Sequence, residues 1–170
     1  MGGLRCVDGS YLTVTPVPCK DSVGVPYEIT LALHRDGSPY GTVGERCGWF
    51  LARLARGVDE ARAEASWPDP EDRFPDDGEL FAFRYRTRLG SPGGELRCQL
   101  RTIPIWQPEG RWLLTRRAYL EAWGTQGVGL RAVLSSSELA AFVGELLAEA
   151  EACLGGRDLA RNPIEGAGSH

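Results

Sequence analysis

The chain has 170 residues, of which 42% are apolar and 25% charged, a composition typical of a globular protein that can bury a core. Its 23 acidic and 19 basic side chains give a net charge of −4, which argues against a dedicated nucleic-acid binder. No apolar run reaches the ~18 residues that a membrane-spanning helix needs, and residues 1–10 lack a signal-peptide pattern. We therefore expect a cytoplasmic protein with one domain over residues 1–156 and a flexible tail at residues 157–170.

The first part of the chain predicts two strands and a helix. Residues 11–17 and 27–34 alternate apolar and polar side chains, which indicates strands with one buried face. Two prolines in the first strand favour an edge position. Thr42 and Glu45 have the spacing of a helix capping box. They are followed by an apolar stripe at helical spacing, so we expect a helix from residue 42 to about residue 65.

Residues 80–134 predict four consecutive strands. In the first, Phe81, Phe83 and Tyr85 alternate with arginines, so one face should be buried and the other solvated. Ser135 and Glu138 then form a second capping-box pair, which opens a final amphipathic helix. The predicted fold class is α+β: an antiparallel sheet of about six strands, with two amphipathic helices packed on one face, in the order ββαββββα.

The third of these four strands, residues 111–123, has no clear face. Neither alternate set of its side chains is consistently apolar. Arg116 or Arg117 must therefore point to the buried side, unless the strand contains a β-bulge.

Arginines on the solvated face of this sheet are the first candidate binding residues. Residues 80–134 contain nine arginines and three glutamates, a net charge of +6. The rigid guanidinium fork suits contacts to carboxylates or phosphates, so this face could bind an acidic protein, an anion or a nucleic acid. The alternative is an ordinary solvated sheet face in a chain with a single lysine. The candidate residues are Arg84, Arg86, Arg88, Arg97, Arg101 and Arg131.

An acidic segment and the tryptophans supply the other candidates. Residues 59–79 contain nine acids and two arginines, a net charge of −7. Their spacing does not match a calcium-binding loop, which leaves either a solvated loop or a negative surface for a basic partner. Trp49 and Trp112 are expected in the core, whereas the other three tryptophans border loops, where they could serve as interface residues. The candidates here are Trp67, Asp69, Asp72, Asp76 and Asp77.

No catalytic residue, metal site or cofactor is predicted. The sequence contains no phosphate-binding loop, dinucleotide fingerprint, serine nucleophile elbow or zinc-protease motif. The five cysteines are spaced too widely for paired metal ligands, and Cys47, Cys98 and Cys153 fit the role of small buried hydrophobes. A cysteine paired with His34 in the folded chain stays open as an alternative.

The order of elements and the ending LRAVLSSSELAAFVGELLAEAEA resemble small α+β immunity-type proteins of bacterial polymorphic toxin systems. The resemblance covers most of the chain in layout but includes no diagnostic motif, so it assigns no functional residue. It implies a protein that binds and blocks one cognate toxin.

The sequence thus predicts a non-enzymatic protein-binding domain that acts through charged surfaces on another protein, with a toxin as one such partner. Two alternatives stay open: a small-molecule or anion-binding domain of a biosynthetic pathway, and an enzyme without a recognisable motif.

Overall fold

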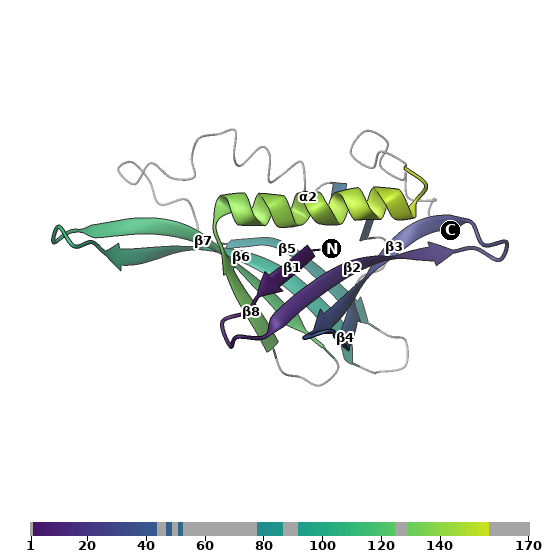
Figure 1. The fold of residues 1–170 in the computed structure, drawn as a ribbon, viewed down its shortest axis with the longest axis horizontal. Coiled ribbons are helices and arrows are strands. Elements are labelled where there is room, and N and C mark those ends of the chain that lie inside the picture. Colours follow the sequence, from purple (N-terminus) through teal and green to yellow (C-terminus); the bar gives the residue numbers. More distant parts are fainter. Residues whose placement is uncertain are drawn as a thin grey trace.

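The computed structural model describes residues 2–43, 47–48, 51–52, 78–86, 92–124 and 129–156. Within them the chain forms two four-stranded antiparallel sheets, each with its strands in sequence order, and one helix with defined bounds (Figure 1). The first sheet contains β1 (Gly2–Arg5), β2 (Tyr11–Lys20), β3 (Pro26–Arg35) and β4 (Ser38–Val43). The second contains β5 (Gly78–Arg86), β6 (Pro92–Trp106), β7 (Trp112–Trp123) and β8 (Gly129–Leu134), and the helix is α2 (Ser136–Cys153).

The expectation of one sheet of about six strands under two helices is therefore wrong. Two short strands, β1 and β4, were not predicted, and the first four strands pair only among themselves in the described chain. Thr42 lies in β4 and does not cap a helix. Cys47 and Leu51 are helical and buried, but most of the helix expected at residues 42–65 lies outside the described residues.

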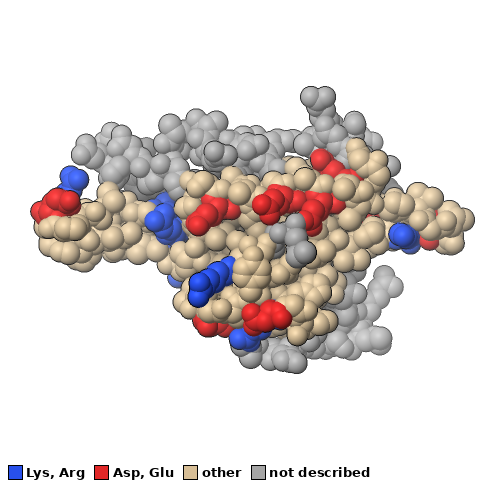
Figure 2. Space-filling model, viewed as in Figure 1, with Lys and Arg blue, Asp and Glu red and all other residues tan. Residues whose placement is uncertain are grey.

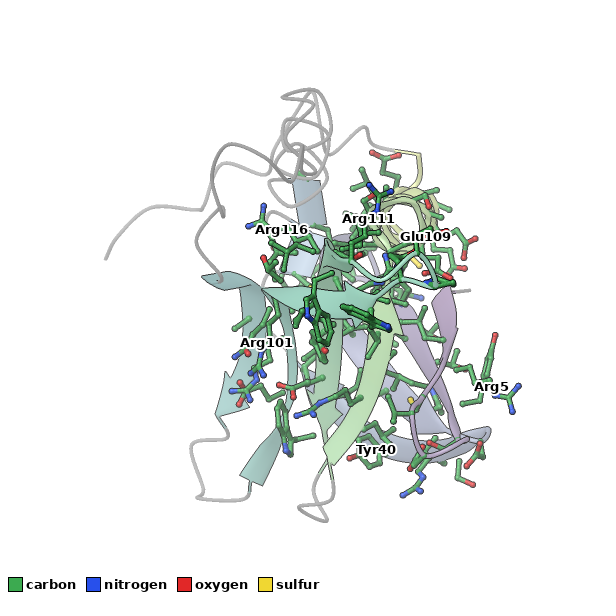
Figure 3. All side chains as sticks on the ribbon, turned by 90° about the vertical axis from the view of Figure 1, so that its left-hand side faces the viewer. Arg5, Tyr40, Arg101, Glu109, Arg111 and Arg116 are labelled. Atoms are coloured by element: carbon green, nitrogen blue, oxygen red, sulfur yellow. The ribbon has the colours of Figure 1, made fainter. Side chains whose placement is uncertain are left out.

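One hydrophobic core joins the two sheets, which face each other across it (Figure 3). The backbones of the two sheets touch where β4 passes β6 and the end of β7. A Cβ atom on Gly94 would lie 2.9 Å from the backbone oxygen of Thr42, and one on Gly124 would overlap the backbone oxygen of Tyr40. Glycine is needed at both positions because the two backbones are in contact. The largest fully buried side chains include Leu12, Leu31, Leu96, Leu120, Leu139 and Leu146.

The final helix was predicted correctly, including its start. The Ser135 hydroxyl accepts a hydrogen bond from the Glu138 backbone, and the Glu138 carboxylate accepts one from the Ser135 N–H at 2.7 Å. The buried stripe of α2 packs chiefly along β2, and Cys153 near its end donates to the backbone oxygen of Pro16 at 3.8 Å. No helix in the described part of the chain is long and apolar enough to span a membrane.

The alternation predicted for β6 and β8 is confirmed. Leu96, Cys98 and Leu100 are buried, whereas Arg97 is partly exposed and Arg101 exposed. In β8, Leu130, Ala132 and Leu134 are buried.

β7 pairs with β6 residue by residue from Trp112 to Trp123 without a register shift, so β7 contains no β-bulge. Arg116 therefore lies on the same face of β7 as the buried Ala118 and Leu120, and Arg117 lies on the opposite face. In β5 the structure describes the backbone and, among the side chains, only that of Ala82. The backbone register of β5 pairs Phe81 with Cys98 and Phe83 with Leu96.

Two hairpins extend beyond the sheets. Within the described residues, β5 pairs with β6 as far as Leu100, and β8 pairs with β7 from Ala118 onward. Residues 101–117 therefore form a two-stranded ribbon, here called the β6–β7 hairpin. Residues 17–30 form a similar ribbon, the β2–β3 hairpin, at the opposite end of the molecule (Figure 1).

Candidate functional site

The structure brings together three of the six predicted arginines. Arg97, Arg101 and Arg131 lie on the outward side of the second sheet. Arg84 and Arg86 lie in β5, where only their backbone is described. The remaining candidates lie outside the described residues: Arg88, Trp67, Asp69, Asp72, Asp76 and Asp77.

A buried glutamate, which sequence reasoning missed, holds two of these arginines. Glu121 in β7 is 3% exposed. Its carboxylate accepts hydrogen bonds from Arg97 Nε at 2.8 Å and from Arg131 Nη2 at 2.6 Å. Burial opposes ionisation, yet the hydrogen bonds and charges of both guanidinium groups hold the pKa of Glu121 below its ordinary value. The glutamate therefore offsets part of the positive charge predicted for this face.

Aromatic rings also contact the guanidinium groups on this side of the sheet. Arg97 lies 4.3 Å from the ring centre of Trp123, and Arg101 lies 5.3 Å from that of Tyr119. Arg131 lies 5.8 Å from the same tyrosine ring. Cation–π contacts of this kind stabilise a sheet face. Arg97, Arg101, Tyr119, Glu121, Trp123 and Arg131 are called the arginine face below; its three arginines and one glutamate leave it a net charge of +2.

A hollow of about 400 Å³ adjoins the arginine face, between β8 and the loop after β1. The backbone N–H of Val7 in that loop donates to the backbone oxygen of Arg131 at 2.8 Å. Asp8 and Glu121 line the hollow together with Arg131. Asp8 accepts hydrogen bonds from Ser10 and from Arg35. Because two carboxylates and one guanidinium group line the hollow, it does not favour the binding of an anion.

The β6–β7 hairpin exposes large apolar side chains on both of its faces, because the neighbouring pairs Trp106–Trp112 and Ile105–Leu113 point to opposite sides of the ribbon. Trp106 and Trp112 face each other across the hairpin, with ring centres 5.1 Å apart in an edge-to-face arrangement. The prediction that Trp112 belongs to the core is wrong, because its strand has left the sheet at this point. The exposed fractions are 37% for Ile105, 55% for Trp106, 64% for Trp112 and 39% for Leu113.

The same hairpin is positively charged. Residues 101–117 contain four arginines and one glutamate, a net charge of +3. Figure 3, which looks onto the hairpin from its tip, shows Arg101 and Arg116 on one side and Glu109 and Arg111 on the other. Acidic side chains, in contrast, follow the exposed face of α2 (Figure 2), whose sequence contains four glutamates and no basic residue.

Reactive side chains do not converge on a chemical centre in the described chain. Burial raises the pKa of the Cys47 and Cys98 thiols to about 12, so both are protonated near neutral pH and are weak nucleophiles. His34 lies in β3, opposite Thr13 in register. The described residues contain no group of three or more side chains that could ligate a metal ion.

We compared the chain with protein-family models, with curated proteins and with solved structures, and nothing matches. The resemblance to immunity-type proteins stays a prediction, and function is inferred from the described residues alone.

Proposed function

We propose that this chain is a protein-binding domain and that the β6–β7 hairpin is its binding element. The observation that supports this proposal is the exposure of Ile105, Trp106, Trp112 and Leu113 on a ribbon that projects from the sheet. Large exposed apolar groups on a soluble surface are typical of interaction sites. Tryptophan and arginine, which this hairpin combines, are the residues most enriched among binding hot spots.

The other exposed apolar positions support binding less well. The β2–β3 hairpin exposes Val23, Val25 and Tyr27, but its tip carries two small valines and no pair of rings. A buried tryptophan removes about 150–250 Å² of surface from water. The two tryptophans of the β6–β7 hairpin can therefore contribute far more to binding than two valines.

A protein surface fits this hairpin better than a membrane or a nucleic acid. The turn at the tip of the hairpin is polar and exposed and includes Glu109. In a membrane this turn would be the first part to enter the apolar interior of the bilayer, which is unfavourable for a charged group. Ile105 and Leu113 offer no ring on which a base could stack. An apolar cleft on another protein would bury both kinds of side chain.

The immunity-type role is one form of this proposal. A protein that blocks a toxin needs a surface that binds the toxin and no catalytic group of its own. The hairpin would supply that surface, with its arginines contacting acidic groups of the toxin.

The test uses the full chain in the cells that produce it. Partners are captured by cross-linking, and the affinity of the main partner is measured with purified proteins. Trp106→Ala combined with Trp112→Ala should weaken binding by about 100-fold, because two hot-spot side chains are removed. The matched control, Val23→Ala combined with Val25→Ala, should bind like the wild type. The proposal is wrong if the valine variant loses binding and the tryptophan variant keeps it.

A further inference from the structure

The two edges of the β6–β7 hairpin are not equivalent. The N–H of Gln107 donates to the backbone oxygen of Arg111 at 2.8 Å and closes the turn. Along an antiparallel ladder, pairs that are hydrogen-bonded to each other alternate with pairs that are not. The next pair, Trp106 and Trp112, is of the second kind, so its backbone N–H and C=O groups point outward to the two edges of the hairpin. Two residues further, the same holds for the pair of Pro104 and Leu114.

The β6 edge is protected by its proline. Pro104 stands at an outward-pointing position, and proline has no N–H group to donate. Proline is one of the usual devices by which proteins stop a free strand edge from pairing with another chain. A partner strand would therefore find a missing donor in the middle of the β6 edge.

The β7 edge has no such protection. Trp112 and Leu114 direct both an N–H and a C=O group outward. β8 covers this edge of β7 only up to the pair of Ala118 and Leu134, after which the chain turns into α2. In the described part of the chain, no strand continues the line of β8 toward the hairpin tip.

We propose that the partner adds an extended strand to the β7 edge at Trp112 and Leu114, in line with β8. This inference rests on the proposed function and specifies how the hairpin binds. Strand addition supplies affinity through backbone hydrogen bonds, and side chains at alternate positions supply selectivity. The ring of Trp112 would cover the added strand from one side.

The chemistry of the hairpin also defines the added strand. Near Trp112 and Leu113 the strand should carry apolar side chains. Toward Arg117 it should carry acidic ones, because the hairpin has a net charge of +3 and opposite charges favour pairing. A second copy of this chain is a poor occupant, since two hairpins of the same charge would repel each other. The partner segment is therefore a proline-free, acidic and apolar strand of a different protein.

The experiment selects peptides from a random display library on the immobilised full chain. Enriched peptides should be acidic, with alternating apolar residues and no central proline. Leu114→Pro should weaken their binding by about tenfold relative to Leu114→Ala, because only the proline removes an outward N–H group. Pro104→Ala, which adds a donor to the opposite edge, should weaken binding far less than Leu114→Pro. On binding, amide exchange should slow at Trp112 and Leu114.

Folding of the Leu114→Pro variant is checked by the circular dichroism signal of the coupled Trp106 and Trp112 rings, which an intact hairpin retains. Equal binding by Leu114→Pro and Leu114→Ala, no enrichment of peptides, or enrichment of basic peptides would each overturn the inference. Dimer formation through this edge in sedimentation experiments would overturn it as well. If the double tryptophan variant loses its cellular partner while Leu114→Pro keeps it, the proposed function stands and strand addition fails.

Discussion

The two hairpins share the form of a two-stranded ribbon, but they differ in what packs against them. Both leave their sheets as two-stranded ribbons, at opposite ends of the molecule (Figure 1). α2 packs along β2, and Cys153 near its end donates to the backbone oxygen of Pro16, one residue before the β2–β3 hairpin. The β6–β7 hairpin instead carries a pair of exposed tryptophans. Their net charges are −1 and +3. The first hairpin extends the core, whereas the second presents side chains to the outside.

The largest effect is expected from weakening α2. Leu146 is 1% exposed on the buried stripe of the helix, and Leu146→Ala should cost about 2–5 kcal/mol of unfolding free energy, measured by urea denaturation. Amide exchange should accelerate in the β2–β3 hairpin and change little in the β6–β7 hairpin. An equal acceleration in both would show that α2 supports the two ribbons alike.

A smaller loss is expected from Glu121, which lies in the sheet at the base of the β6–β7 hairpin. Glu121→Gln should cost about 2 kcal/mol at neutral pH, because hydrogen bonds to charged groups are replaced by weaker ones while both arginines keep access to water. Because the folded protein lowers the pKa of Glu121, its contribution is present above the ordinary value of 4.5 and is lost as pH falls through the lower folded value. Chemical denaturation as a function of pH should therefore show a shallower acid loss in the variant, and identical pH profiles would contradict this account of the ion pairs.

The smallest effect on stability is expected at the hairpin tip. Trp112→Ala removes one edge-to-face ring contact, which contributes about 0.5–1.5 kcal/mol. Because the ribbon lies outside the core, the loss should appear as faster local amide exchange in residues 101–117, with little change in the global unfolding free energy. A global loss comparable to that of Leu146→Ala would place the tryptophan in the core after all.

Local patterns in the sequence were sufficient to predict parts of this fold. The capping box at Ser135 and Glu138 located the final helix, and alternation in β6 and β8 assigned buried and exposed faces correctly. These features depend on neighbours within one element, so they can be read from short stretches.

The division into two sheets could not be predicted in the same way. It depends on the approach of β4 to Gly94 and Gly124, which lie far away in the sequence. The short β1 and β4 strands give weak alternation signals.

The candidate site shows the same limit. Arg97 and Arg131 were correctly placed on one face, but Glu121 was missed because β7 has no clear period. The exposure of Trp106 and Trp112 follows from the points where β5 and β8 stop pairing, which no residue pattern in the hairpin reveals. A symmetric pair of tryptophans around a turn was the one available signal.

The most direct test of the central claim is amide hydrogen exchange of the full chain, measured with and without the captured partner. The account predicts slowed exchange concentrated in residues 101–117, with residues 17–30 unchanged. Slowed exchange in residues 17–30, with residues 101–117 unchanged, would contradict it.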